Sequence, residues 1–239
     1  MRIINTRPQP DSTSLTQALT VLGHEVIEAP LLDIRFEDRS GSLALDDVQA
    51  VLATSANGVR ALAAATERRE ISLFAVGDAS ARTAEELSFR NVTSADGDVE
   101  DLAATVVHVL DPADGALLHV AGSKIAGDLV GTLASAGFAT RRVTLYESRP
   151  VISLPPSASM ALKSGNADAM VFFSPRTAKT FVRLADDEGV THACQLLNAC
   201  CLSSGVAEEI SGVAWRAVHV AERPSQDSLL DCLSDTALT

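Results

Sequence analysis

The sequence predicts an α/β protein built from two similar domains, each a parallel sheet covered by helices. Three observations support this prediction. The 239-residue chain is 46% hydrophobic, which is enough for a sizeable core. Short apolar or β-branched runs alternate with longer stretches whose apolar residues recur at helical spacing. Segments of the first half are echoed in the second half, which indicates a duplicated α/β unit.

Ten short segments have the composition of buried strands, because each is apolar and bounded by polar or turn-forming residues. They are residues 2–5, 25–28, 50–53, 73–76, 91–93, 117–120, 140–145, 169–173, 199–202 and 216–220. Between strands, residues 15–22 and 99–110 place apolar side chains at i, i+3, i+4 and i+7, which predicts amphipathic helices packed on the sheets.

The internal repeat also indicates how the domains are connected. Three pairs of segments resemble each other: 50–62 and 169–181, 73–81 and 199–207, and 15–23 and 129–137. The unit at residue 1 pairs with the unit at 117, whereas the unit at 50 pairs with the unit at 169. If each domain holds one unit of each kind, the chain must leave the first domain, build the second and return.

Turn-forming residues mark both expected crossings, at 29–35 and 146–150. We therefore expect two flavodoxin-like domains with five parallel strands each, joined by a two-stranded linker. The expected boundaries are residues 1–33 with 150–239 for the discontinuous domain, 38–145 for the inserted domain, and about 34–37 and 146–149 for the linkers.

Composition excludes several classes of protein. The net charge is −12, whereas duplex nucleic-acid binders draw affinity from Lys and Arg, so no nucleic-acid partner is expected. No run of about eighteen apolar residues could span a bilayer, so no membrane partner is expected. The N-terminal residues show no apolar signal region, and nothing resembles an amphipathic dimer helix. A cytoplasmic monomer is the expectation.

Cysteine and histidine spacing predicts no metal site. Cys194, Cys200, Cys201 and Cys232 show no CxxC spacing and are expected to be reduced core thiols. The five histidines form no HxH or HExxH pattern. His119 and His219 lie in apolar strand-like runs, which favours a structural role for both.

The predicted strand ends are rich in small, hydroxyl-bearing and cationic residues. They are Thr6 to Pro8, Thr54 to Asn57, Gly77 to Ser80, Gly122 to Lys124, Ser174 to Thr177, and Ser203 to Gly205. Ligands bind at such ends in parallel sheets, because helix N-termini present free N–H donors there. The same residues cap helices, so capping and carboxylate binding both remain open, Ser174 being the clearest example.

Other known site patterns are missing. Residues 122–127 have the first spacing of a P-loop but continue with Asp128 and Leu129 instead of Lys and Ser or Thr. Neither GxGxxG nor the GxSxG nucleophile elbow occurs. ATP chemistry, dinucleotide binding and acyl transfer therefore lack support.

Six motifs, in their order and layout, carry a more specific signal. They are Thr-Arg-Pro at 6–8, Thr-Ser-Ala-Asn-Gly-Val-Arg at 54–60, Ala-Val-Gly-Asp-Ala-Ser-Ala at 75–81, Gly122 with a basic neighbour, Val-Thr-Leu-Tyr-Glu-Ser at 143–148, and Val-Phe-Phe-Ser-Pro-Arg-Thr-Ala at 171–178. Together they resemble the uroporphyrinogen-III synthase family over most of the chain. One departure occurs at residues 202–207, where the family has Ile-Gly-x-x-Thr-Ala and this chain has valine at 206. A hydroxyl role at that position is therefore in doubt.

The resemblance implies a cyclase that acts on hydroxymethylbilane, a linear tetrapyrrole with eight carboxylates, with loss of water and inversion of ring D. It implies no metal and no organic cofactor. Tyr146 stands where the family has a tyrosine suited to protonating the departing hydroxyl; its alternative role is to pack on Pro150. The implied substrate-binding residues are Arg7, Ser55, Asn57, Gly77, Ser80, Gly122, Ser123, Lys124, Ser174, Pro175, Arg176, Ser203, Ser204 and Gly205.

An acidic chain that binds a polyanion needs a locally positive cleft. The residues expected there are Arg7, Arg60, Lys124, Arg149 and Arg176. Two other classes of function remain open. A two-domain module could bind a tetrapyrrole or another small molecule without converting it. A flavin protein is the third reading, although Trp215 and Tyr146 are the only large polar aromatics and neither follows a phosphate loop.

Overall fold

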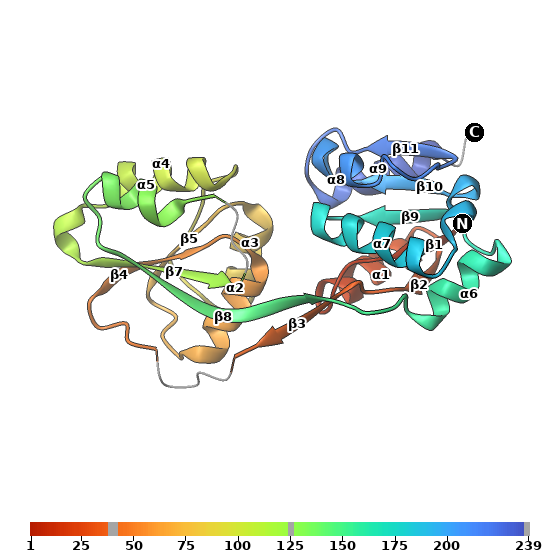
Figure 1. The fold of residues 1–239 in the computed structure, drawn as a ribbon. Helices are drawn as coiled ribbons and strands as arrows, with labels where there is room; N and C mark the ends of the chain where they lie inside the picture. Colours follow the sequence, from red (N-terminus) through yellow and green to blue (C-terminus); the bar gives the residue numbers. More distant parts are fainter. Residues whose placement is uncertain (38–42, 124–126, 237–239) are drawn as a thin grey trace. The chain divides into compact units, whose positions relative to one another are not determined.

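The computed structural model describes residues 1–37, 43–123 and 127–236. The chain forms two compact units, which Figure 1 shows with the chain crossing between them twice. Unit 1 comprises Met1–Asp33 and Arg149–Thr239, and unit 2 comprises Ile34–Ser148. The expected start of the inserted domain at residue 38 and the expected site residue Lys124 lie outside the described residues.

Unit 1 contains a five-stranded sheet in which every strand is parallel to its neighbours. Its strands are β1 (Arg2–Asn5), β2 (Glu25–Glu28), β9 (Ala169–Phe172), β10 (Asn198–Cys201) and β11 (Ala217–Val220), in the spatial order β11-β10-β9-β1-β2. Both faces are covered, which explains why all four residues of β9 are buried instead of alternating.

Helices pack on the two faces of this sheet (Figure 1). One layer contains α1 (Asp11–Val21) and α9 (Gln226–Thr236). The opposite layer contains α6 (Pro156–Ser164), α7 (Pro175–Asp187), the 3₁₀ segment η2 (Thr191–Leu196) and α8 (Ser204–Glu209).

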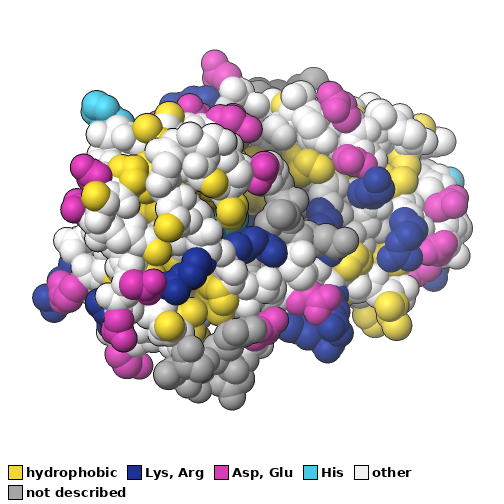
Figure 2. Space-filling view, turned by 60° about the vertical axis from the view of Figure 1, so that its left-hand side comes forward, with side chains coloured by type: hydrophobic (Ala, Val, Ile, Leu, Met, Phe, Trp, Pro, Cys, Tyr) yellow, Lys and Arg dark blue, Asp and Glu magenta, His cyan; other side chains and the backbone are white. Residues whose placement is uncertain are grey.

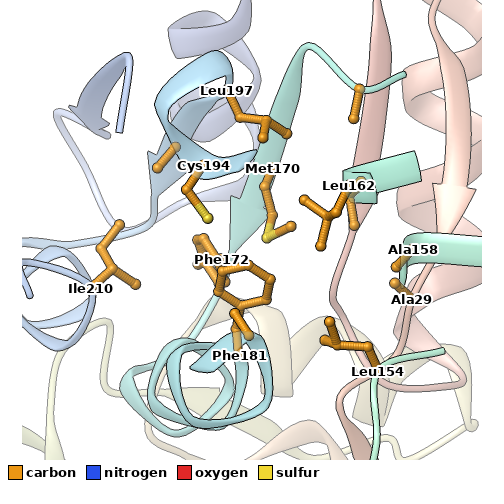
Figure 3. Packing of buried hydrophobic residues seen from close by; sticks show 14 of the residues in the cluster. Ala29, Leu154, Ala158, Leu162, Met170, Phe172, Phe181, Cys194, Leu197 and Ile210 are labelled. Carbon is orange, nitrogen blue, oxygen red and sulfur yellow. The ribbon is translucent and has the colours of Figure 1, made fainter. Parts of the chain in front are cut away.

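Aromatic and aliphatic side chains fill the space between β9 and α7 (Figure 3). The rings of Phe172 and Phe181 lie 5.5 Å apart between centroids, and each also contacts the ring of Trp215. Met170 and Leu162 complete this part of the core. Truncating Phe181 to alanine would cost about 3–5 kcal/mol of stability.

Unit 2 contains a six-stranded sheet, not the five-stranded sheet expected. Its strands are β3 (Leu32–Phe36), β4 (Val48–Ala53), β5 (Ser72–Ala75), β6 (Val92–Ser94), β7 (Ala116–Gly122) and β8 (Thr140–Pro150), in the order β3-β8-β7-β4-β5-β6. The sixth strand arises because the expected linker residues 34–37 and 146–149 belong mostly to β3 and β8, which pair with each other. The Glu37 N–H donates to the Leu145 carbonyl and the Val151 N–H to the Leu31 carbonyl, so the two strands run in opposite directions.

Helices again cover both faces of the unit 2 sheet. α2 (Ala56–Ala65) and α3 (Asp78–Glu86) pack on one face, and α4 (Val99–Val109) and α5 (Leu129–Ser135) pack on the other. A short 3₁₀ segment, η1 (Pro112–Asp114), precedes β7.

The two sheets have the same spatial order once the repeated segments are matched. Matching β1 with β7 and β9 with β4 turns the order β2-β1-β9-β10-β11 into β8-β7-β4-β5-β6. In unit 1 this is the 2-1-3-4-5 order of doubly wound sheets. In unit 2 the chain visits the same positions in permuted order, beginning at the third. The internal repeat seen in the sequence is therefore a repeat of architecture.

All ten predicted strands are confirmed, with ends that differ by a few residues. Both predicted helices are also confirmed, but Leu22 and Val107 of their apolar stripes are about half exposed. The four cysteines are buried and free of disulfides, and burial raises the thiol pKa of Cys194, Cys200 and Cys201 to about 12. No described helix is long and apolar enough to cross a membrane.

Candidate functional site

Three neighbouring strands of unit 2 bring polar residues to one sheet edge. β7, β4 and β5 are parallel neighbours, so their carboxyl ends meet on the same side. These ends carry Gly122 and Ser123 after β7, Thr54 to Asn57 after β4, and Gly77 to Ser80 after β5. The sequence predicted this grouping, and the register shows why it forms.

Ser55 links a helix cap to the chain's only tyrosine. It is the N-cap of α2, and its Oγ accepts the Gly58 N–H at 3.1 Å. The same Oγ lies 2.9 Å from the phenolic oxygen of Tyr146, so the two hydroxyls form a hydrogen bond. The capping role expected for such serines is therefore present, and the oxygen also serves a second partner.

Tyr146 reaches Ser55 from β8 and lies against Gly122 of the neighbouring strand β7. A Cβ atom at Gly122 would come within 2.7 Å of the tyrosine ring. The Ser123 N–H also donates to the Tyr146 carbonyl at 3.0 Å. Tyr146 is half-buried and packs on the core formed by the sheet with α2 and α3.

The remaining polar residues of this edge have different surroundings. Asn57 accepts from the Arg60 guanidinium at 3.0 Å, so these two residues act together in the first turns of α2. Gly77 is the N-cap of α3, and Ser80 is buried in the first turn of that helix. Asp78 lies between them, and its carboxylate would repel an anion at this helix end. The turn from β4 into α2, Thr54 to Asn57, is here called the Ser55 elbow, and such a turn from a strand into a helix is called an elbow below. The Ser55 elbow is thus better suited than the start of α3 to bind a carboxylate.

His119 lies in β7 and points to the face of the sheet that is covered by α4 and α5, opposite to the face that carries α2 and α3. It is 4% exposed, its Nε2 is 3.5 Å from the Thr54 hydroxyl, and its Nδ1 has no hydrogen-bond partner. Burial, together with the nearby Arg142 guanidinium, lowers the pKa of His119 to about 4. The imidazole is therefore neutral at pH 7, in keeping with the structural role expected.

Unit 1 presents an equivalent edge at the ends of β1, β9 and β10. Ser174 is the N-cap of α7, its Oγ accepts the Thr177 N–H at 3.2 Å, and it lies 2.8 Å from the Thr177 hydroxyl. Pro175 occupies the first turn of that helix, as predicted, and Arg176 follows it half-buried. Ser174 thus corresponds to Ser55 but bonds within its own helix.

Side chains from three different segments hold Arg7 at this edge. Its guanidinium lies 3.6 Å from the Asp11 carboxylate, stacks on the Phe173 ring at 4.3 Å, and donates to the Gln226 side chain at 3.0 Å. Such a restrained cation loses little conformational entropy when it binds a carboxylate.

The elbow after β10 is the least developed. Ser203 is the N-cap of α8 but forms no side-chain cap hydrogen bond, Ser204 is exposed, and Gly205 has open space around it. Capping therefore does not explain Ser203. Val206 is buried in the core, so this position presents no hydroxyl at the strand end.

The expected basic cleft stays a prediction. Arg7, Arg176 and the exposed Arg149 belong to unit 1, and Arg60 belongs to unit 2. On the face shown in Figure 2, Lys and Arg side chains lie among Asp and Glu side chains. Among the described residues, no three or more His, Cys, Asp or Glu side chains group as a metal site would require.

Two surface hollows of unit 1 lie away from the strand ends. One, of about 460 Å³, is lined by α6 residues such as Met160 and Lys163. The other, of about 450 Å³, lies between α7, η2 and residues 212–214. Neither contains a predicted site residue.

Sequence reasoning missed several residues that support the site. Phe173 and Gln226 restrain Arg7, and Arg142 of β8 donates to the Gly122 carbonyl. Gln226 is far from Arg7 in the chain, so only the strand order reveals the pair. The sequence did carry one signal for the position of Tyr146. Leu145 and Tyr146 are adjacent and both apolar in character, which interrupts the alternation of apolar and polar residues in β8.

Taken together, the fold and the strand ends define a class: two-unit α/β proteins whose hydroxyls, cations and helix ends are suited to anionic small molecules. A family model described as uroporphyrinogen-III synthase HemD matches residues 13–231, and the chain belongs to this family of cyclising lyases. The fold is similar to that of a mutant uroporphyrinogen III synthase from the extremely thermophilic bacterium Thermus thermophilus, with 19% identity, 100% of this chain and 99% of that chain covered, and a TM-score of 0.60.

A uroporphyrinogen-III synthetase from Helicobacter pylori is also similar, with 17% identity, 98% of this chain and 99% of that chain covered, and a TM-score of 0.66. At these identities the two structures establish the fold alone. No curated protein matches the chain. The family assignment therefore rests on the family model, and ring closure in haem biosynthesis is consistent with it.

Proposed function

We propose that this enzyme converts hydroxymethylbilane to uroporphyrinogen III, closing the macrocycle with inversion of ring D and loss of water. The observation that carries the proposal is the hydrogen bond of 2.9 Å between the Tyr146 hydroxyl and Ser55 Oγ at a strand-end edge. It provides a proton donor beside groups suited to bind carboxylates.

Tyr146 protonates the departing hydroxyl in this mechanism. The C–O bond breaks with its electron pair moving to oxygen, which takes the phenolic proton and leaves as water, while the pyrrole nitrogen stabilises the methylene cation. The substituted carbon of ring D attacks the cation and gives a spiro intermediate. That intermediate fragments and recloses, and the final loss of a ring proton restores the phenol and the aromatic pyrrole.

Ser55 favours this direction of proton transfer. Its Oγ already accepts the Gly58 N–H, and its own proton is available to donate to the phenolic oxygen. The Tyr146 proton then faces the leaving group, and the Ser55 hydroxyl stabilises the negative charge that develops on the phenolic oxygen.

Selectivity comes from positioning, because spontaneous closure gives the isomer without inversion. The strand-end groups of each unit hold substrate carboxylates in this proposal. In unit 1 they are Arg7, Ser174, Pro175, Arg176, Ser203, Ser204 and Gly205, and in unit 2 they are Ser55, Asn57, Gly77, Ser80 and Ser123. The restrained Arg7 guanidinium supplies the clearest charge-assisted contact.

The architecture belongs to the same proposal. Each unit is a flavodoxin-like domain, and in unit 2 the chain visits the same sheet positions in a permuted order. The enzyme works as a cytoplasmic monomer without a metal or an organic cofactor. The matched sheet orders support the flavodoxin-like description.

An isomer assay tests the activity. Hydroxymethylbilane is generated in situ from porphobilinogen, the protein is added, and the oxidised porphyrins are separated into isomers I and III. We expect isomer III well above the control without protein. Isomer I alone, from folded protein with an active coupling enzyme, would instead favour a non-catalytic tetrapyrrole-binding module, a reading that the undeveloped Ser203 elbow would then support.

A further inference from the structure

The pairing of β7 with β8 contains an irregularity beside Tyr146. Ala121 pairs with Thr144, but the next residue, Gly122, pairs with Tyr146, so Leu145 is an extra residue in β8. Such a bulge changes the face to which the following side chains point. Leu145 and Tyr146 accordingly both pack on the core shared with α2 and α3, although adjacent residues of a regular strand point to opposite faces.

In a regular strand of the same sequence, Tyr146 would follow Leu145 onto the opposite face, which is covered by α4 and α5. Arg142 marks that face, because it lies opposite His119 in the register and its charge influences that imidazole. Ser55 is on the other side, at the start of α2. The bulge is therefore what allows the phenol to meet Ser55.

Gly122 provides the space that the turned ring needs. An added Cβ would lie 2.7 Å from Cζ, 2.9 Å from Cε2 and 3.0 Å from the phenolic oxygen of Tyr146. These atoms form the hydroxyl-bearing end of the ring, so an alanine would displace the group that bonds Ser55. Hydrogen bonds fix the Gly122 backbone in turn, because its carbonyl accepts from the Arg142 guanidinium and the next N–H donates to the Tyr146 carbonyl.

We propose that Gly122 and the bulge at Leu145 are positioning elements for Tyr146, which together hold its hydroxyl against Ser55 Oγ in the geometry required for proton transfer. This inference rests on the proposed function. It replaces the substrate contact expected of Gly122 with an action through Tyr146.

The experiment exploits the fact that Tyr146 is the only tyrosine. The full chain is produced with 3-fluorotyrosine, so that one ¹⁹F resonance reports the ring, and steady-state kinetics are measured on unlabelled protein. We expect Gly122→Ala to shift this resonance and to lower kcat by roughly 10²-fold with KM changed less than threefold. The matched control is Gly212→Ala, because no atom lies within 4 Å of the added methyl group, and we expect both readouts to remain as in wild type.

A double mutant separates an effect through the phenolic hydroxyl from a general loss of structure in Gly122→Ala. If Gly122 acts through the phenolic hydroxyl, adding Gly122→Ala to Tyr146→Phe lowers kcat no further. Ser55→Ala should likewise shift the ¹⁹F resonance, independently of any variant at Gly122.

Three results overturn the inference: an unmoved ¹⁹F resonance, a higher KM at unchanged kcat in Gly122→Ala, or additive losses in the double mutant. A higher KM alone would restore the substrate-contact role. The proposed function fails by a different result, namely wild-type protein that yields no isomer III.

Discussion

Ser55 and Ser174 occupy equivalent positions in the two units, yet their hydroxyls have different partners. Both are N-caps after matched strands, and both accept an N–H from the third residue of the helix. Ser174 completes its bonding with Thr177, whereas Ser55 bonds Tyr146 from another strand. The same local sequence signal therefore gives a serine that bonds only within its own helix cap in one unit and a serine that also bonds a side chain from another strand in the other.

The central strands differ in the same way. The register places Asn5 beside Val171 and His119 beside Leu52, which are matched positions of the repeat. The Asn5 amide donates to Ser12 and Thr16, whereas His119 keeps one ring nitrogen without a partner. The matched buried position is therefore satisfied locally in unit 1 and only in part in unit 2.

Removing the partner that Ser55 has and Ser174 lacks should produce the largest effect. We expect Tyr146→Phe to lower kcat about 10³-fold, because a general acid contributes on the order of 10²–10⁴. Stability should fall by only about 1 kcal/mol, the value of one hydrogen bond. Isomer-resolved kinetics and urea unfolding measure both quantities, and normal turnover would remove the acid role.

Replacing His119 by asparagine, the residue at the matched position 5 of unit 1, should sharpen the comparison of the two central strands. The folded pKa near 4 lies below the ordinary value of 6.5, so the unfolded chain binds an extra proton between these values. Stability in the wild type should therefore fall by up to about 3 kcal/mol as the pH drops from 6.5 to 4, and should gain nothing further above 6.5.

Urea unfolding across this pH range checks the prediction. His119→Asn should lose this component, whereas His108→Asn, on an exposed part of α4, should keep it. Parallel pH profiles for wild type and His119→Asn would contradict the assignment.

Charge at the unit 1 edge can be removed without removing packing. Arg7→Met keeps an apolar side chain over Phe173 but loses the guanidinium, and we expect KM to rise about tenfold, consistent with a hydrogen bond to a charged group. The exposed pair Arg2–Glu25 supplies the control, since Arg2→Met should leave KM unchanged. Equal KM values for the two variants would exclude Arg7 from binding.

Removing the hydroxyl of either N-cap serine should give the smallest effects. Ser55→Ala and Ser174→Ala should each lose about 1 kcal/mol of stability, because each removes an N-cap. Only Ser55→Ala should also lower kcat, by about fivefold, through the lost bond to Tyr146, whereas Ser174→Ala should raise KM. Equal kinetic changes in the two variants would mean that the elbows act alike.

The sequence was sufficient for the parts of the fold that depend on local composition. Strands such as Arg2–Asn5 were located because apolar runs end at polar or turn-forming residues, and the elbows followed from the parallel class. The two-stranded linker was expected, but its addition to the unit 2 sheet as a sixth strand was missed, because a mostly exposed segment such as Leu32–Phe36 does not indicate which sheet it extends. The bulge beside Tyr146 depends on one register shift, which composition does not encode.

The return of the chain to unit 1 has a consequence during synthesis. Arg2 bonds Asp168, 166 residues later, so β1 and β2 emerge from the ribosome long before β9 does. Two strands alone are marginally stable, whereas every strand of unit 2 lies in one continuous stretch. Unit 2 can therefore fold first, and its pairing of β3 with β8 brings Leu31 within a hydrogen bond of Val151. Once unit 2 is folded, the segment between residues 31 and 151 acts as a short loop. The loss of chain entropy on closing unit 1 is then much smaller.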